Sequence, residues 1–185
     1  MDPGKNSYRR YLDGDDKGME EIILKYRDGL IFYLNQFVGS LELAEELAED
    51  TFVLLCIKKP RDKGGCSFKT WLYTIGRNLA IDFLRRRARQ RRVSIDLCDS
   101  LSSEEQGPEE AYLKDQQKIA VNKALGALKS EYRQVLWLFY FEEMSFKEIS
   151  IVMKKSIRAT QMLATRARKA LKEELIKEDI IDETH

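Results

Sequence analysis

The sequence is poor in the residues that usually build metal sites and covalent cross-links. Its only histidine is His185, and its three cysteines, Cys56, Cys66 and Cys98, are widely spaced with no CxxC pair. A catalytic or metal site based on histidine is therefore not expected. An odd number of separated cysteines also argues against a disulfide framework or a thiolate zinc site, and it favours a reducing compartment.

Long apolar runs are missing as well. No stretch approaches the roughly 20 apolar residues that span a bilayer, and the polar N-terminus has no apolar core of signal-peptide length. No glycine-rich phosphate loop precedes a predicted helix, and the acidic residues form helical rows instead of an isolated pair in an apolar pocket. We therefore expect a soluble, cytoplasmic protein with no membrane insertion, no metal, no cofactor and no enzymatic activity.

Charge and helix-forming residues are abundant. Charged residues make up 34% of the chain and hydrophobic residues 43%, while a net charge of only +1 hides strong segregation along the sequence. Only three prolines occur and alternating strand patterns are absent, so the predicted fold class is all-α, in one ordinary domain or two small ones. The spacing of apolar residues predicts helices over about 7–12, 16–38, 41–57, 67–92, 109–127, 130–142, 145–153 and 156–176. Gly39 is expected to end the second of these helices, and Ser40 and Ser130 are expected to cap the helices that follow them.

A change in composition marks the predicted domain boundary. Residues 94–110 contain six acidic side chains and no basic one, together with Ser, Gly and Pro. Such a like-charged, poorly periodic stretch is typical of a flexible tether. We therefore predict two small helical domains, residues 1–92 and 109–185, joined by an acidic linker over 93–108.

The helix predicted over 67–92 has two different faces. Helical spacing predicts a buried apolar stripe of Phe68, Trp71, Leu72, Ile75, Leu79 and Phe83. The same spacing turns Tyr73, Arg77 and Asn78 outward, together with Thr70 and Thr74. An exposed ring, guanidinium and amide are typical of a surface that reads single-stranded nucleic acid.

Six arginines follow within eight residues: Arg85, Arg86, Arg87, Arg89, Arg91 and Arg92. A solvated helix end, where cations favour the C-terminal dipole, accounts for one or two of them. Six repel one another unless an anion is close, so phosphate binding is the favoured interpretation.

The last two predicted helices have the pattern of a helix-turn-helix. Ser145 and Glu148 form a capping box, Lys154 and Lys155 leave a very short turn, and Ser156 can cap the next helix. That last helix is expected to bury Ile157, Ala164, Ala167, Leu171 and Leu175. Its outer surface, suited to the major groove unless its arginines are ordinary surface charge, is Ser156, Arg158, Gln161, Met162, Thr165, Arg166 and Lys169.

The helix over 41–57 carries an acidic face of Glu42, Glu45, Glu46, Glu49 and Asp50. Composition leaves two interpretations open: a solvated surface, or a site for a basic partner.

Five segments resemble the extracytoplasmic-function sigma factors of bacterial RNA polymerase. "GDDKGMEEIILKY" at 14–26 is similar to the opening helix of the family and "AEELAEDTF" at 44–52 to its polymerase-binding helix. "FKTWLYTIGRNLAIDFLRRRAR" at 68–89 resembles its promoter-melting segment. "LKSEYRQVLWLFYFEEMSFKEIS" at 128–150 and "RARKAL" at 166–171 resemble its C-terminal module.

The resemblance implies a role for each module. The first, region 2, would bind the clamp helices of the largest subunit of core polymerase through Glu45, Glu46, Glu49 and Asp50. It would also bind the unpaired minus-ten strand, and Asn78 aligns with a family position on a loop that captures a flipped-out base. The second, region 4, would bind the flap of the second-largest subunit and read the minus-thirty-five element. An anti-sigma factor is a further partner that the family often has. The predicted single-strand set is Tyr73, Arg77, Asn78, Arg85, Arg86, Arg87 and Arg89.

The sequence also departs from the family pattern. Leu128-Lys129 stands where Leu-Pro is common, and the usual cations of the recognition helix are missing at Gln161 and Leu163. Two other functions stay open: a free-standing helix-turn-helix repressor or activator, and a helical adaptor whose charges are surface charges.

Overall fold

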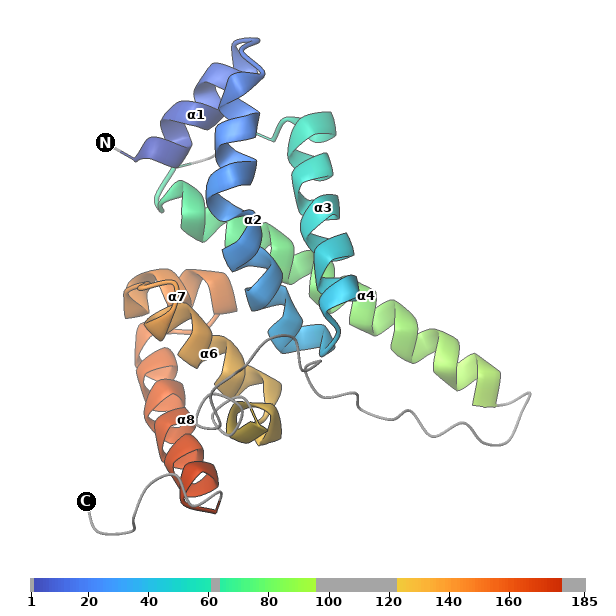
Figure 1. Cartoon of the computed structure of the whole chain (residues 1–185), viewed down its shortest axis with the longest axis vertical. Coiled ribbons are helices and arrows are strands. Elements are labelled where there is room, and N and C mark those ends of the chain that lie inside the picture. Colours follow the sequence, from blue (N-terminus) through green and yellow to red (C-terminus); the bar gives the residue numbers. More distant parts are fainter. Residues whose placement is uncertain (1, 61–63, 96–122, 178–185) are drawn as a thin grey trace, which may run out of the picture. The chain divides into compact units, whose positions relative to one another are not determined.

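A computed structural model describes residues 2–60, 64–95 and 123–177, with the backbone alone for 91–95 (Figure 1). Within these ranges every regular element is a helix. The chain divides into two compact units, Met1–Glu105 and Gln106–His185, so the all-α class with two small domains is confirmed. The predicted linker lies mostly outside the described residues, and its limits stay a prediction, although the helical backbone of α4 continues to Ile95, past the expected end at 92.

The first unit contains four helices that pack around α2. They are α1 (Pro3–Leu12), α2 (Lys17–Val38), α3 (Leu41–Lys58) and α4 (Phe68–Ile95). Helix α2 contacts the other three, and α3 also packs on α4. The C-terminal half of α4 extends beyond the end of the α2–α3 pair (Figure 1).

Local signals set most of these helix ends. Gly39 adopts a left-handed φ of 66° and ends α2, and the Ser40 hydroxyl accepts a bond from the Leu43 amide at 3.4 Å to begin α3, both as predicted. The prediction that α1 starts at residue 7 is wrong by about one turn, because the helix begins at Pro3. Pro3 occupies the first helical position, where its missing N–H costs nothing.

The Asp2 carboxylate joins the beginnings of two helices. Its Oδ1 accepts bonds from the Gly4 and Lys5 amides at 3.0 and 3.3 Å, and its Oδ2 accepts one from the Phe68 amide at 2.6 Å. Phe68 is the first residue of α4 and is fully buried, with ring centroids 5.5 Å from Tyr8 and 5.6 Å from Tyr26. This aromatic cluster fixes α1 and α2 against the start of α4.

The second unit contains α6 (Ser130–Tyr140), α7 (Phe146–Met153) and α8 (Ile157–Lys177). Residues 123–127 are also helical, and the rest of the helix predicted over 109–127 lies outside the described residues. Each of α6, α7 and α8 contacts the other two, and their core is Val135, Leu138, Ile149, Met153, Thr160, Ala164 and Ala167.

The helix-turn-helix is present as predicted. The Ser145–Glu148 capping box is complete in both directions, Lys154 takes a left-handed φ of 53° at the end of α7, and the Ser156 hydroxyl accepts the Ala159 amide at 3.1 Å. Ser130 was expected to cap α6 and does not, because it is already the first residue of the helix and Lys129 occupies the cap position.

Candidate nucleic-acid interface

The buried face of α4 differs from the predicted one. Tyr73, expected to be exposed for base stacking, is only 1% exposed, and Thr70 is fully buried. The Tyr73 ring packs on Tyr33 of α2 with centroids 5.3 Å apart. Conversely, Trp71, Ile75, Leu79 and Phe83 of the predicted stripe are only half-buried. Tyr73 therefore belongs to the core of the first unit and is removed from the single-strand surface.

Small residues explain this rotation of α4. A Cβ atom added at Gly76 would lie 3.0 Å from Leu30 Cδ1 and 3.5 Å from Leu34 Cδ2 of α2. Ala80, one turn later, is fully buried. A pattern of large apolar side chains does not include either residue. Because both are small, they let α2 and α3 pack closely on α4 at this face, which becomes its core face.

Arg77 and Asn78 occupy the border between this core and solvent. Both are half-buried, and the Arg77 Nε atom is buried without a hydrogen-bond partner. The resemblance places the base-capturing position on a loop, but Asn78 lies inside α4, so any base that it contacts must approach a helix.

The arginines that follow are exposed as predicted. Arg85, Arg86, Arg87 and Arg89 all face solvent; Arg85 makes a 3.6 Å ion pair with Asp82, which is exposed as well. Exposed pairs of this kind contribute little stability, so the guanidinium groups stay available to phosphates. Positions 78, 85 and 89 are separated by seven and four residues, which places Asn78, Arg85 and Arg89 on one stripe of α4. The side chains of Arg91 and Arg92 lie outside the described residues.

The outer surface of α8 agrees with its prediction. Thr160, Ala164 and Ala167 form its buried stripe, and the seven predicted contact residues, Ser156, Arg158, Gln161, Met162, Thr165, Arg166 and Lys169, are all exposed. Ile157 was expected to be buried and is 45% exposed. It begins the helix before the stripe, and Thr160 takes the core position, with its hydroxyl satisfied by the Ser156 carbonyl at 3.0 Å.

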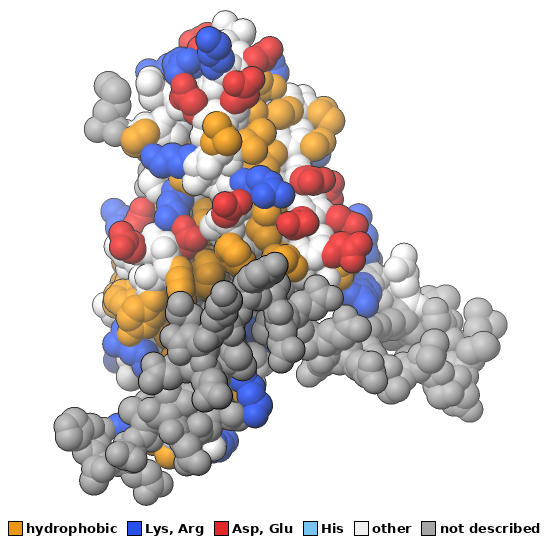
Figure 2. All heavy atoms as spheres, in the orientation of Figure 1, with side chains coloured by type: hydrophobic (Ala, Val, Ile, Leu, Met, Phe, Trp, Pro, Cys, Tyr) orange, Lys and Arg blue, Asp and Glu red, His pale blue; other side chains and the backbone are white. Residues whose placement is uncertain are grey.

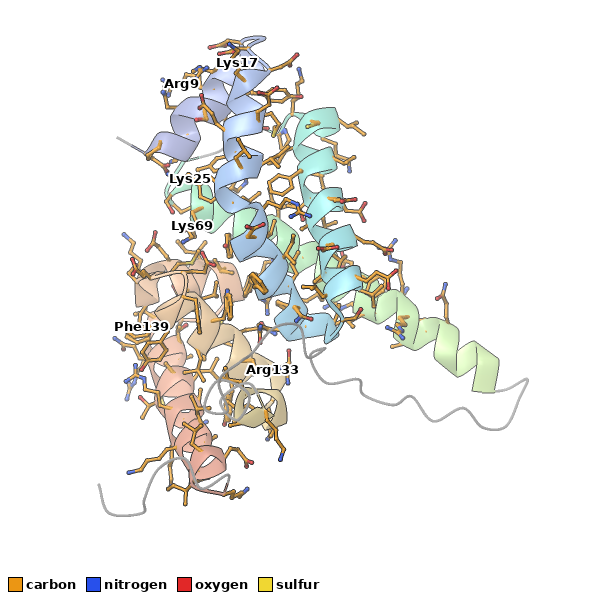
Figure 3. The ribbon with its side chains drawn as sticks, viewed as in Figure 1. Arg9, Lys17, Lys25, Lys69, Arg133 and Phe139 are labelled. Carbon is orange, nitrogen blue, oxygen red and sulfur yellow. The ribbon has the colours of Figure 1, made fainter. Side chains whose placement is uncertain are left out.

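Besides Ser156, whose hydroxyl caps α8, two of these contact residues already have partners within the helix. The Thr165 hydroxyl donates to the Gln161 carbonyl at 3.0 Å, and Lys169 makes an exposed 3.9 Å pair with Glu173. Arg168 instead lies over the ring of Phe139 (labelled in Figure 3) at 5.3 Å and ties α8 to α6. Arg158 and Arg166 are therefore the cations of the α8 surface best placed to reach DNA.

The acidic row of α3 lies on the surface of the first unit. Glu46, Glu49 and Asp50 are exposed, and Glu45 makes a long 3.9 Å pair with Arg27 of α2. Figure 2 shows acidic side chains gathered over α3. An acidic row with one long ion pair among the described residues fits a basic partner surface.

Exposed aromatic side chains at the end of α6 are a feature that the sequence analysis missed. Tyr140 is 55% and Phe141 60% exposed, and the Phe141 ring stacks on Trp137 at 4.2 Å. The signal was the run "WLFYF" at 137–141, since five consecutive apolar residues cannot all face one side of a helix. Across the described residues, no group of three or more His, Cys, Asp or Glu side chains is arranged to hold a metal ion. In the same part of the chain, no helix combines the length and the apolar character that crossing a bilayer requires.

Comparisons with known proteins match both units. The family described as Sigma-70 region 2 matches residues 22–90, and Sigma-70, region 4 matches residues 118–171. RNA polymerase sigma factor YlaC of Bacillus subtilis (strain 168) is 30% identical over 160 residues, which cover 86% of this chain and 92% of that protein. ECF RNA polymerase sigma factor SigM of the same strain is 28% identical over 158 residues, covering 83% and 93% of the two chains.

A solved structure shares the fold. It is the sigma factor RpoE in complex with the anti-sigma factor NepR from Bartonella quintana, with a TM-score of 0.68 at 24% identity, covering 86% of this chain and 97% of that one.

Proposed function

Since this chain belongs to the extracytoplasmic-function family of RNA polymerase sigma factors, we propose that α4 captures an unpaired promoter strand while α8 reads duplex DNA upstream. As a sigma factor, the protein binds core RNA polymerase, directs it to promoters and promotes their melting. The observation that supports these two separate roles is the difference between the surfaces of α4 and α8. A cationic stripe with a half-buried amide runs along α4, and a helix-turn-helix exposes a polar face of α8.

On α4, Asn78 supplies an amide that can pair with the edge of an extruded base, and Arg85, Arg86, Arg87 and Arg89 supply charge for the phosphates on either side. Both contacts need a separated strand, because a paired base hides its Watson–Crick edge. On α8, Arg158, Gln161 and Arg166 have the side-chain chemistry for base edges and phosphates in the major groove. These contacts would read the minus-ten and minus-thirty-five elements, respectively.

The acidic surface of α3 is the proposed site for core polymerase. Glu45, Glu46, Glu49 and Asp50 would contact the basic clamp helices of the largest subunit, while the second unit would hold the flap of the second-largest subunit. Supporting this, the long Arg27 pair is the only one among the described residues that neutralises any part of the row. We also propose that the protein contributes no catalytic residue, acts in the cytoplasm, and is controlled by an anti-sigma factor. The last point is supported by the structure of similar fold, in which the sigma factor RpoE is in complex with the anti-sigma factor NepR.

Dependence on core polymerase tests this function against a free-standing helix-turn-helix regulator, which the α7–α8 geometry alone would also suit. Labelled promoter duplex is incubated with the full chain, with and without core enzyme. We expect a specific footprint and transcripts only when core is present. A footprint by the chain alone would favour the regulator, and no footprint in either case would refute both functions.

The substitution Asn78→Ala tests base capture. Removing a base-edge contact should cost about 1–3 kcal/mol of discrimination. Promoter opening, followed with a fluorescent base analogue, should slow, and preference should relax at one minus-ten position. Asn6→Ala, at an exposed position on α1, is the control that should leave both unchanged. If the Asn78→Ala variant had the same base preference as wild type at every minus-ten position, Asn78 would not belong to the interface.

A further inference from the structure

Two buried polar atoms that have no hydrogen-bond partner among the described residues lie on the facing helices α2 and α4. They are the Tyr33 hydroxyl oxygen and the Arg77 Nε atom. Tyr33 has no exposed surface, so its hydroxyl is closed off from bulk solvent. Buried polar groups in folded proteins almost always have hydrogen-bond partners, and a pair that lacks them is a reason to look for a partner gained in another state.

The geometry brings these two groups toward each other. Tyr73, which packs on Tyr33 at 5.3 Å, precedes Arg77 by four residues, so both α4 side chains leave the helix on the side of Tyr33. Burial raises the pKa of Tyr33 above its ordinary value, and Arg77 opposes that rise through its charge and as a side-chain donor, although the two groups do not reach the geometry of a formed hydrogen bond. The phenol is therefore neutral at physiological pH, with an oxygen lone pair able to accept the Nε proton.

The guanidinium of Arg77 contains two terminal nitrogens besides Nε. Arg77 as a whole is half-buried, and Nε is the atom of its side chain that is buried without a partner. A guanidinium is planar, so a bond that fixes Nε also fixes the direction of the two terminal nitrogens. Those nitrogens can then bind two oxygens of one phosphate side by side.

We propose that Tyr33 is a positioning residue for Arg77. When a phosphate of the unpaired strand engages the terminal nitrogens of Arg77, Nε donates a hydrogen bond to the Tyr33 hydroxyl. The buried phenol thereby aims the guanidinium at the strand and reduces the side-chain entropy lost on binding. This role rests on the proposed function, because it requires a strand beside α4.

The test uses the full chain with core polymerase and a fluorescent single-stranded oligonucleotide that carries the minus-ten sequence. Anisotropy gives the affinity over a series of salt concentrations for wild type, Tyr33→Phe, Arg77→Ala and the double variant. We expect Tyr33→Phe to weaken binding about threefold to tenfold. Arg77→Ala should weaken binding further and lower the salt slope by about 0.7, the value for one phosphate contact on a single strand.

The double variant separates positioning from a merely structural role. If Tyr33 acts through Arg77, Tyr33→Phe adds no loss in the Arg77→Ala background, nor in an Arg77→Lys background, which keeps the charge but has no Nε to hold. Tyr26→Phe removes another largely buried hydroxyl from α2 and is the matched control, expected to bind as wild type. Equal losses from Tyr33→Phe with and without Arg77 would overturn the proposal, as would wild-type binding by Tyr33→Phe. If wild type itself ignores the oligonucleotide, the proposed function fails and the role of Tyr33 with it.

Discussion

At the scale of single residues, the smallest side chains decide how the first unit packs. Gly18 at the start of α2 is buried against α1, and a Cβ atom there would collide with the Ser7 carbonyl oxygen and lie 2.8 Å from the Tyr11 amide nitrogen. Both neighbours are backbone atoms, which cannot rotate away. The contact between α1 and α2 therefore needs glycine at this position for space and not for backbone conformation.

Gly18→Ala should consequently destabilise the first unit, by about 1–3 kcal/mol as for other overpacked sites. The free energy of unfolding in urea, followed by the fluorescence of Trp71, measures this. The sign of the change in unfolding free energy is informative, because alanine in an uncrowded helix stabilises by about 0.5–1 kcal/mol relative to glycine. A more stable Gly18→Ala variant would show that α1 does not pack on α2 as described.

Single residues also explain why the exposure of Tyr73 was predicted wrongly and the exposure of Arg85 correctly. Exposure of the arginines follows from their own solvation, which is a property of each side chain. Which face of α4 is buried depends on the helices that pack against it. Gly76 and Ala80 allow that packing, but neither has a large apolar side chain that would mark the face in the sequence. The orphaned Tyr33–Arg77 pair was hidden for the same reason, since the two residues lie 44 positions apart and meet only through packing.

At the scale of elements, helix ends were predictable where their signals are local. Gly39, Ser40, Ser145 and Ser156 each act within four residues of the end that they define. The beginning of α1 was missed although its signals, the Asp2 cap and Pro3 at the first helical position, are local as well. The second role of Asp2, the cap of α4, is not local, because that helix begins 66 residues later. A carboxylate shared by two helix N-termini gains from both dipoles.

A graded pair of substitutions tests that shared cap. Asp2→Asn keeps one acceptor oxygen for the Gly4 and Lys5 amides but places an NH₂ group toward Phe68, so the cap of α4 is lost. Asp2→Ala loses both caps. At about 0.5–2 kcal/mol per cap, the loss of unfolding free energy for Asp2→Ala should be about twice the loss for Asp2→Asn. Equal losses would mean that only the bond to α4 stabilises the unit, and no loss for Asp2→Asn would mean that only the bonds within α1 do.

At the scale of the whole molecule, the net charge of +1 is the sum of acidic and basic surfaces that are proposed to bind different partners. The acidic row of α3 and the arginines of α4 belong to the same unit, yet they lie on different helices and serve different proposed partners. The order of these segments along the chain sufficed to predict the family, because each motif is a continuous run of residues. Side-chain contacts across helices required the structure.

The division into two units predicts two independent unfolding transitions, and the sequence supplies a reporter for each. The chain has two tryptophans, Trp71 in α4 and Trp137 in α6. In the single-tryptophan variants Trp71→Phe and Trp137→Phe, the remaining indole reports the urea transition of its own unit. Ser145→Ala, which breaks the capping box of α7, should lower the stability of the second unit by about 1 kcal/mol and shift only the Trp137 transition. Gly18→Ala should shift only the Trp71 transition. If either substitution moved both transitions together, the units would unfold cooperatively, and the picture of two separate domains would be wrong.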